Sequence, residues 1–202
     1  MYIPQHFIQN DPAELAELIN GNNFGTLVSV VDQRPFATHL PFVYDQAAAC
    51  LRAHMARSNP HWQSLASASD TALVIFQGPH AYVSPSWYNA PGVPTWNYVT
   101  VHVYGSFRII ENPQEHQQLL EDLTERHEAS QTTPWVAEFD SAPVGDMIGS
   151  TVAFEITVTE IQGKFKLNQN RSSSDRTGVI DALENEGSDN ATGIAGQMRR
   201  LT

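Results

Sequence analysis

The chain has 202 residues, and its 22 Asp and Glu residues outnumber its 11 Lys and Arg residues, which gives a formal net charge of −11. So acidic a chain is a poor candidate for direct DNA or RNA binding, which needs clustered basic side chains. The hydrophobic fraction of 41% is that of a globular protein, and no apolar run approaches the roughly 20 residues of a membrane span.

The predicted elements follow an order typical of an antiparallel β structure. In chain order they are a helix at residues 10–19, strands at 24–31, 36–44 and 51–55, a helix from 59, a strand at 71–76 that 81–84 can continue after a break at Gly78-Pro79, a loop at 84–95, a strand at 96–111, a helix at 112–128, a short helix at 144–148, a strand at 151–161 and a helix at 175–183. Consecutive hairpins with few crossover helices indicate a small antiparallel β-barrel with flanking helices, an α+β fold. We expect one domain over residues 1–186 and a flexible C-terminal tail over residues 187–202.

Several common kinds of site are missing from the sequence. The start, Met1-Tyr2-Ile3-Pro4, lacks the features of a signal peptide, and the one cysteine, Cys50, permits no internal disulfide, so we expect a cytoplasmic location. Although the chain has eight histidines, it has no HExxH and no Cys/His pairing at zinc spacing, and we predict no metal site. It also lacks GxSxG, GxGxxG and Walker A motifs.

A candidate anion site lies between His54 and Trp62. Backbone N–H groups at the start of the expected helix, with Arg57 and the Ser58 hydroxyl beside them, suit a phosphate. The alternative is that Asn59 only caps the helix and that Arg57 is a solvated surface charge.

The segment from Gly163 to Arg171 is dense in hydrogen-bond donors. It contains the only two lysines of the chain, Lys164 and Lys166, followed by Asn and Gln amides. Point charges combined with planar amides suit a ligand with both a phosphate and heteroaromatic edges. A polar surface loop is the alternative.

Two further features are consistent with a planar ligand. The strand segment Ala37–Pro41 contains a proline, which implies an edge, a bulge or a strand end where backbone groups are exposed. An aromatic belt surrounds the proline-rich loop and can form a ligand wall, a dimer interface or core packing. Its members are Tyr82, Trp87, Tyr88, Trp96 and Tyr98.

Taken together, these stretches resemble the PaiB-like family, the FMN-binding negative transcriptional regulators. The resemblance covers residues 1 to about 183, and its segments are residues 1–4, 37–41, 54–62, 78–88, 93–98 and 163–171. It implies a split β-barrel related to pyridoxamine-phosphate oxidase-like folds, in a homodimer with FMN at the subunit interface. In one departure from the family, the loop at residues 89–92 is short and has no basic residue.

The resemblance also implies the cofactor-binding residues. His54, Arg57, Ser58 and Asn59 would face the FMN phosphate, Thr38, His39 and Leu40 would line the isoalloxazine, and Lys166, Gln169 and Asn170 would complete the site from the partner subunit.

The role of the flavin stays open between two classes. One is a negative regulator of transcription that acts indirectly, through redox or small-molecule sensing. The other is a flavin-dependent oxidoreductase or reductase, for which His39 and His80 are the residues to test as acids or bases. Haem or another planar ligand in the same fold is a third alternative, and no catalytic residue is assigned.

Overall fold

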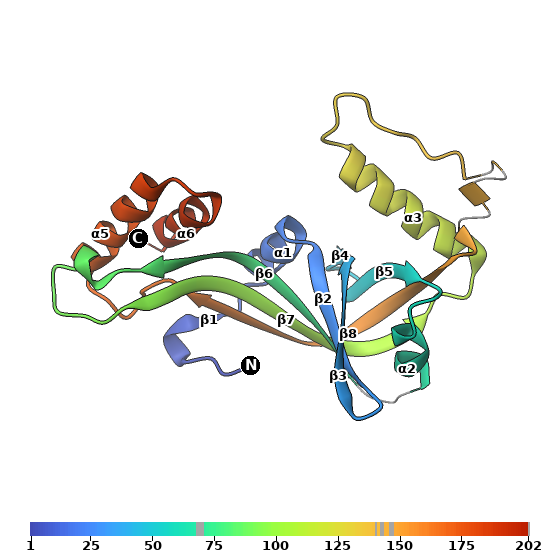
Figure 1. Ribbon diagram of the computed structural model, residues 1–202, viewed down its shortest axis with the longest axis horizontal. Helices are drawn as coiled ribbons and strands as arrows, with labels where there is room; N and C mark the ends of the chain where they lie inside the picture. The colour runs from blue at the N-terminus through green and yellow to red at the C-terminus, as the bar shows by residue number, and fades with distance from the viewer. Residues whose placement is uncertain (68–70, 140, 142–143, 146–147, 202) are drawn as a thin grey trace. The chain divides into compact units, whose positions relative to one another are not determined.

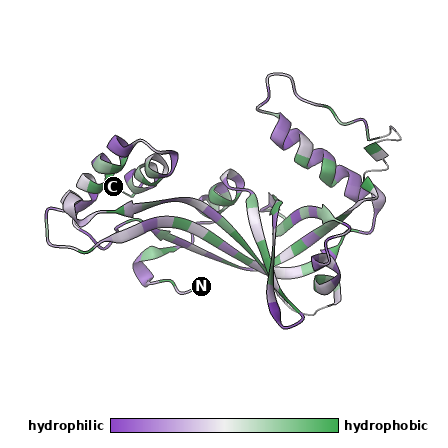
Figure 2. Cartoon of the chain, viewed as in Figure 1, coloured by the Kyte–Doolittle hydropathy of each residue, from purple (hydrophilic) through white to green (hydrophobic). Residues whose placement is uncertain are grey.

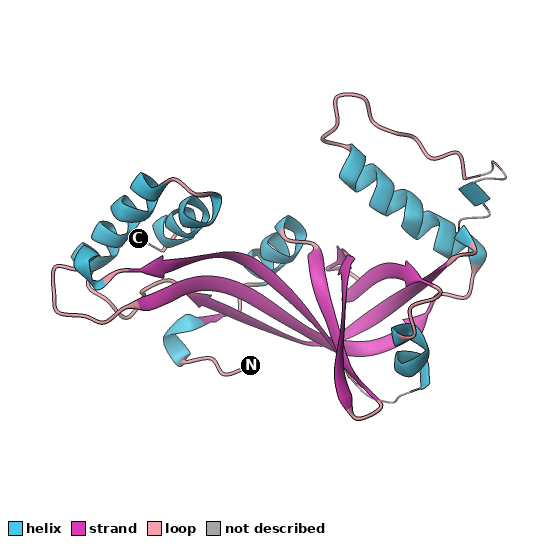
Figure 3. Ribbon diagram, in the orientation of Figure 1, coloured by secondary structure: helices cyan, strands magenta, loops and turns pink. Residues whose placement is uncertain are grey.

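The computed structural model describes residues 1–67, 71–139, 141, 144–145 and 148–201 (Figure 1). Its elements are η1 (Gln5–Phe7), β1 (Ile8–Gln9), α1 (Pro12–Gly21), β2 (Phe24–Val31), β3 (Arg34–Pro41), β4 (Val43–Asp45), β5 (Cys50–Ala56), α2 (His61–Ser67), β6 (Ala72–Val83), η2 (Pro85–Trp87), β7 (Thr95–Ile109), α3 (Pro113–Glu128), β8 (Thr151–Lys166), α5 (Ser173–Glu186) and α6 (Asp189–Arg199) (Figure 3). In the described part of the chain, no helix is long and apolar enough to cross a membrane.

The chain divides into two compact units that share three strands. We call residues 22–76 and 103–161 the barrel unit, and residues 1–21, 77–102 and 162–202, which include both termini, the terminal unit. The strands β6, β7 and β8 run from one unit into the other, and hydrophobic and hydrophilic segments alternate along them (Figure 2).

In the barrel unit the two ends of the strand path are neighbours along the chain. The strand order is β3-β2-β6-β7-β8-β5-β4, and only Phe42 separates the two end strands, β3 and β4, along the chain. The fully buried Phe42 ring packs edge-on against Phe76 and Phe154, with ring centroids 5.6 and 6.2 Å apart. Pairing of β2 with β3 and β6, of β4 with β5, and of β5 with β8 is antiparallel. The predicted antiparallel barrel with flanking helices is therefore confirmed.

Local chemistry explains two features of the barrel strands. The β2–β3 hairpin turns at Asp32 and Gln33, whose φ angles of 48° and 62° match the right-handed twist of a tight hairpin. On β7, a Cβ at Gly105 would collide with the Thr157 carbonyl oxygen of β8, so only glycine permits this approach of the two strands.

Helices cover one face of the sheet in the terminal unit. A Cβ on Gly78 of β6 would contact Leu18 of α1, and one on Gly193 of α6 would contact Pro79. The buried Asn97 of β7 donates a hydrogen bond to the sulfur of Met198 on α6 (3.5 Å). The apolar faces of these helices therefore form the core of this unit.

The structure corrects three predicted elements. The strand expected at residues 36–44 is two strands, because the buried Phe42 interrupts it. The break expected at Gly78-Pro79 is not found, because β6 runs through these two residues and continues the strand into residues 81–83. The tail expected to be unstructured contains α6, capped by Ser188, because small and apolar residues spaced three and four apart provide a buried stripe: Ala191, Ile194, Ala195 and Met198. The helix expected at 144–148 lies partly outside the described residues, and the single domain over residues 1–186 stays a prediction.

Candidate functional site

A hydrogen-bond network in the barrel unit joins β3 to the turn between β5 and α2. The Asn59 amide nitrogen donates to Thr38 Oγ1 (3.2 Å), and Thr38 Oγ1 shares a second hydrogen bond with His61 Nδ1 (2.8 Å). The other ring nitrogen of His61 bonds to Ser29 Oγ (2.8 Å), and Asn59 Oδ1 accepts the His61 backbone N–H (3.0 Å). The predicted phosphate turn and the predicted ring-lining strand are thus in direct contact.

His61 is the central residue of this network. It is fully buried as the first residue of α2, and burial lowers its pKa below the usual value for histidine. Neutral imidazole matches these partners, because one nitrogen donates and the other accepts. The sequence analysis did not assign His61 or Ser29 to the site. The signal available was a histidine directly after the Asn59-Pro60 cap.

Arg57 is partly engaged by the backbone. Its Nε and Nη2 atoms each donate at 2.8 Å, to the carbonyl oxygens of Gly149 and Thr151, which precede and begin β8. Since a guanidinium has five N–H groups, some of its donors are left for a ligand. Ser58 next to it is exposed, whereas both polar atoms of the Asn59 amide bond within the protein. Asn59 therefore positions the turn.

His54 is the one residue of the predicted site with an unsatisfied buried atom. The Nδ1 atom of His54 is buried and has no hydrogen-bond partner. Burial, with a contribution from His116 of α3, lowers the His54 pKa. Burial, then Arg57, lowers the pKa of His116, whose Nε2 shares a hydrogen bond with Thr151 Oγ1 (2.9 Å). Both imidazoles are consequently neutral near pH 7.

β3 provides the remaining predicted residues of the barrel unit. It lies at one end of the strand path and Pro41 is its last residue, so of the three alternatives that the proline left open, an edge and a strand end are found and a bulge is not needed. His39 is exposed and its ring stacks on Phe24 (centroids 6.3 Å apart), whereas Leu40 is buried. An edge strand leaves backbone N–H and C=O groups on one side available to a ligand.

The other three predicted residues lie in the terminal unit, at and just after the end of β8. Lys166 Nζ donates to the Thr95 hydroxyl and to the Trp96 carbonyl oxygen (2.5 Å). Burial, with the nearby Lys164, lowers the pKa of the Lys166 ammonium. The Gln169 amide bonds to the backbone of Phe165 and Leu167, and Asn170 is exposed. Lys166 and Asn170 thus keep polar groups that can reach a ligand.

The same segment supports the loop that is short in this chain. Asn168, with a φ of 59°, donates from its amide to the Tyr88 hydroxyl (3.1 Å), and the Arg171 guanidinium lies 4.3 Å from the Tyr88 ring centroid. The buried Asp175 carboxylate accepts the backbone N–H groups of Asn89 (2.8 Å) and Ala90 (3.2 Å). This loop is therefore held by three side chains.

The aromatic belt is only partly core. Tyr82 and Trp96 are 46% and 47% exposed, with ring centroids 6.2 Å apart, and the His80 ring stacks on Trp96 at 5.8 Å. The buried Lys164 lies with its ammonium 5.2 Å from the Tyr98 ring centroid. Exposed aromatic side chains beside cations suit a planar, anionic ligand or an interface.

Comparisons with known proteins identify the family. A model described as "Putative FMN-binding domain" matches residues 1–160. The chain is 37% identical over 204 residues to the Bacillus subtilis (strain 168) "Protease synthase and sporulation protein PAI 2", covering 98% of this chain and 96% of that protein. The chain belongs to this FMN-binding family. The resemblance seen in the sequence and FMN as the cofactor are thereby confirmed.

Solved structures confirm the split-barrel fold. A FAD- and heme-binding protein from Mycobacterium smegmatis has a TM-score of 0.64 at 17% identity, over 84% of this chain and 78% of that one. A "Putative Pyridoxamine 5'-phosphate oxidase" from Listeria innocua has a TM-score of 0.51 at 16% identity, over 75% of this chain and 96% of that one. The fold is accordingly the split barrel found among flavin-binding proteins.

The donors present in the chain fit FMN. A phosphate needs cationic or neutral N–H and O–H donors, and the β5–α2 turn presents Arg57 and Ser58. The buried Nδ1 atom of His54 has no hydrogen-bond partner in the barrel unit, so it is available to a polar group of a ligand. The available edge of β3 suits the carbonyl and N–H edge of an isoalloxazine ring.

Proposed function

We propose that this protein is a homodimer that binds FMN at its subunit interface and acts as a flavin-dependent sensor with an indirect effect on transcription. The observation that carries the site is the contact between Thr38 on the edge strand β3 and Asn59 in the β5–α2 turn. It joins a strand edge for the ring to a donor-rich turn for the phosphate. Lys166, Gln169 and Asn170 in this proposal are supplied by the partner subunit.

In this proposal, different residues of the chain contact different parts of FMN. The Arg57 guanidinium neutralises the phosphate and the Ser58 hydroxyl donates to it, while the network through His61 keeps the turn against β3. The neutral His54 offers a ring nitrogen to a ligand group without adding charge. FMN, when bound, supplies hydride or single-electron transfer.

An FMN titration tests the site. Ser58→Asp introduces a carboxylate at an exposed position, so it avoids the backbone bonds that Arg57 makes. We expect FMN affinity to fall about 10- to 100-fold, the equivalent of ~1.5–3 kcal/mol lost at a charged contact. Ser130→Asp, at an exposed residue after α3, adds the same charge as a control and leaves the affinity unchanged. Equal affinities of the two variants would remove the turn from the site.

The net negative charge of the chain is the reason why we propose an indirect effect on transcription and not direct DNA binding. A chain with a net charge of −11 repels a DNA backbone, and Lys164, one of its two lysines, lies beside the Tyr98 ring. We expect no specific gel shift with genomic DNA fragments at moderate salt, with or without FMN. A specific shift that weakens with salt would replace this proposal with direct repression.

The oxidoreductase alternative makes a different prediction in the same preparation. His39 is exposed on the edge strand, where it can reach a ligand's ring. Steady oxidation of NADPH or NADH by the FMN-loaded protein, lowered by His39→Gln, would favour an enzyme over a sensor. Under the sensor proposal, turnover stays at the level of free FMN. A Soret band in the purified protein would favour haem.

A further inference from the structure

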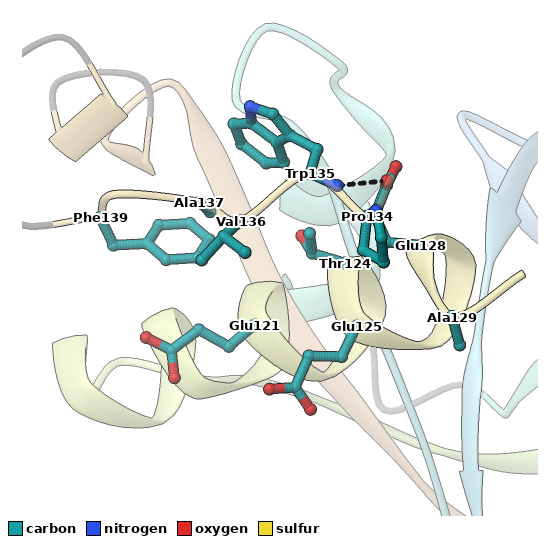
Figure 4. A pocket seen from close by; sticks show the side chains of 10 residues that line it. All are labelled: Glu121, Thr124, Glu125, Glu128, Ala129, Pro134, Trp135, Val136, Ala137 and Phe139. Atoms are coloured by element: carbon teal, nitrogen blue, oxygen red, sulfur yellow. Dashed lines mark hydrogen bonds between the residues drawn. The ribbon is translucent and has the colours of Figure 1, made fainter. Parts of the chain in front are cut away.

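A cavity in the barrel unit is separate from every residue assigned to FMN. It lies between α3 and the segment at residues 134–139 and has a volume of about 340 Å³. Figure 4 shows Val136 and Phe139 facing the helix and the carboxylates of Glu121 and Glu125 on the helix side. The volume lies within the roughly 300–1,000 Å³ typical of small-molecule sites.

The apolar wall of this cavity is exposed yet fixed. Trp135 is 56% exposed and Val136 is 79% exposed, so two large apolar side chains face water next to one another. The Trp135 backbone N–H donates to Glu128 Oε2 at 2.7 Å, which ties the segment to the end of α3 (Figure 4). Neighbouring exposed apolar groups on a tethered segment are typical of a binding surface.

The opposite wall is acidic. Glu121, Glu125 and Glu128 are spaced four and three apart on α3, so they form one stripe along the helix. In the described part of the chain, none of the three is paired with a Lys, Arg or His side chain. Glu121 accepts a bond from the neutral Gln117 amide (2.9 Å), and Glu128 accepts the Trp135 N–H. Like charges at this spacing repel one another, and a bound cation would relieve that repulsion.

The same surroundings narrow the choice of cation. Among the described residues, no three metal-ligating side chains converge on one point, so a compact metal ion lacks its ligands. A second copy of this chain would bring a net charge of −11 to an acidic surface. Aromatic and aliphatic side chains opposite carboxylates fit an organic cation with a hydrocarbon body.

We propose that the cavity between α3 and residues 134–139 binds an organic amine whose ammonium group faces the glutamates and whose aryl or alkyl group packs on Trp135, Val136 and Phe139. This site is independent of FMN and does not rest on the proposed flavin function. The carboxylates favour a positively charged ligand, and the apolar wall favours a hydrocarbon group about the size of one aromatic ring.

Calorimetric titration with three matched probes tests the site, on the full chain with and without FMN. The probes are 2-phenylethylamine, the neutral 2-phenylethanol and the anionic 3-phenylpropionate. We expect the amine to bind about tenfold more tightly than the alcohol, with an advantage that shrinks as salt rises, and the anion to bind least. Equal affinities for the three probes, or no saturable binding of the amine, would overturn the proposal.

Substitutions in the acidic wall and in the apolar wall distinguish what each contributes to ligand binding. The double variant E121Q/E125Q is expected to weaken amine binding about tenfold and to leave the alcohol unaffected. Trp135→Ala should weaken both ligands, because it removes the wall that they share. Glu111→Gln, an exposed position just before α3 that does not line the cavity, is the charge-matched control and should change neither. If E121Q/E125Q or Trp135→Ala instead shifts the oligomeric state, the cavity is a subunit contact and the proposal is wrong.

Discussion

The barrel unit and the terminal unit place their polar residues in opposite ways. In the barrel unit the predicted site residues surround neutral, buried histidines, and their side chains bond mainly to one another and to the backbone. In the terminal unit the lysines and Arg171 lie over aromatic rings and against carbonyl groups. The first arrangement makes a rigid support, and the second concentrates the scarce positive charge of an acidic chain.

The largest effect that distinguishes the units is expected at the core of the barrel. Phe42→Ala removes a fully buried ring from the point where β3 and β4 meet along the chain, and we predict a loss of about 3–5 kcal/mol in unfolding free energy. Urea denaturation followed by tryptophan fluorescence measures it. A loss well below that of Leu183→Ala, in the core of the terminal unit, would show that the barrel is not the better-packed unit.

A smaller effect is expected where β7 and β8 approach closely. Gly105→Ala places a methyl group against the Thr157 carbonyl oxygen, and we predict a cost of about 1–3 kcal/mol from overpacking. Gly21→Ala, at the end of α1, is the matched control, because no atom lies within 4 Å of the added Cβ. Similar denaturation midpoints for both variants would mean that the two strands can separate at little cost.

Acid should destabilise the barrel unit more than the terminal unit. Burial is the main cause of a lowered pKa at His54, His61 and His116 in the barrel unit, and at His102 in the terminal unit. These histidines bind protons more tightly in the unfolded chain than in the folded one. The stability that the neutral histidines give the folded state is therefore complete above a pH of about 6.5 and is lost as the pH falls toward the folded pKa values. The urea midpoint should drop between pH 7.5 and 5.5, and His61→Gln should reduce the drop. A midpoint that rises on acidification would contradict the buried neutral network.

The smallest effect is expected at the surface of the terminal unit. Arg200 pairs with Glu17 and Glu14 through exposed side chains, and such pairs contribute little because water and salt screen them. We expect Arg200→Ala to leave the thermal midpoint within experimental error at physiological salt. A clear loss would show that this pair is needed to hold α6 against α1.

The sequence predicted most strands of the fold, but not the contacts that the predicted site residues make. Pro41 indicated an edge, a bulge or a strand end, and it proves to be the last residue of an edge strand, but nothing in a local pattern showed that Phe42 would separate two strands. The helix α6 was not predicted, because alanines such as Ala191 and Ala195 do not stand out as apolar in the sequence. The structure shows that both are buried and belong to the apolar face of the helix. The family resemblance implied Asn59 and Gln169 as cofactor-binding residues, and the structure shows their amide donors bonded within the protein, which depends on long-range folding.

We propose that each FMN site combines the β5–α2 turn of one subunit with Lys166 of the other. Subunits carrying Ser58→Asp and subunits carrying Lys166→Ala, each with its own affinity tag, are co-expressed and the mixed dimers purified. The two parent homodimers should bind FMN weakly, whereas the mixed dimer should regain one tight site, because one of its two FMN sites carries both substitutions and the other carries neither. FMN stoichiometry by absorbance decides the question. A mixed dimer that binds as weakly as its parents would show that the subunits do not share the site.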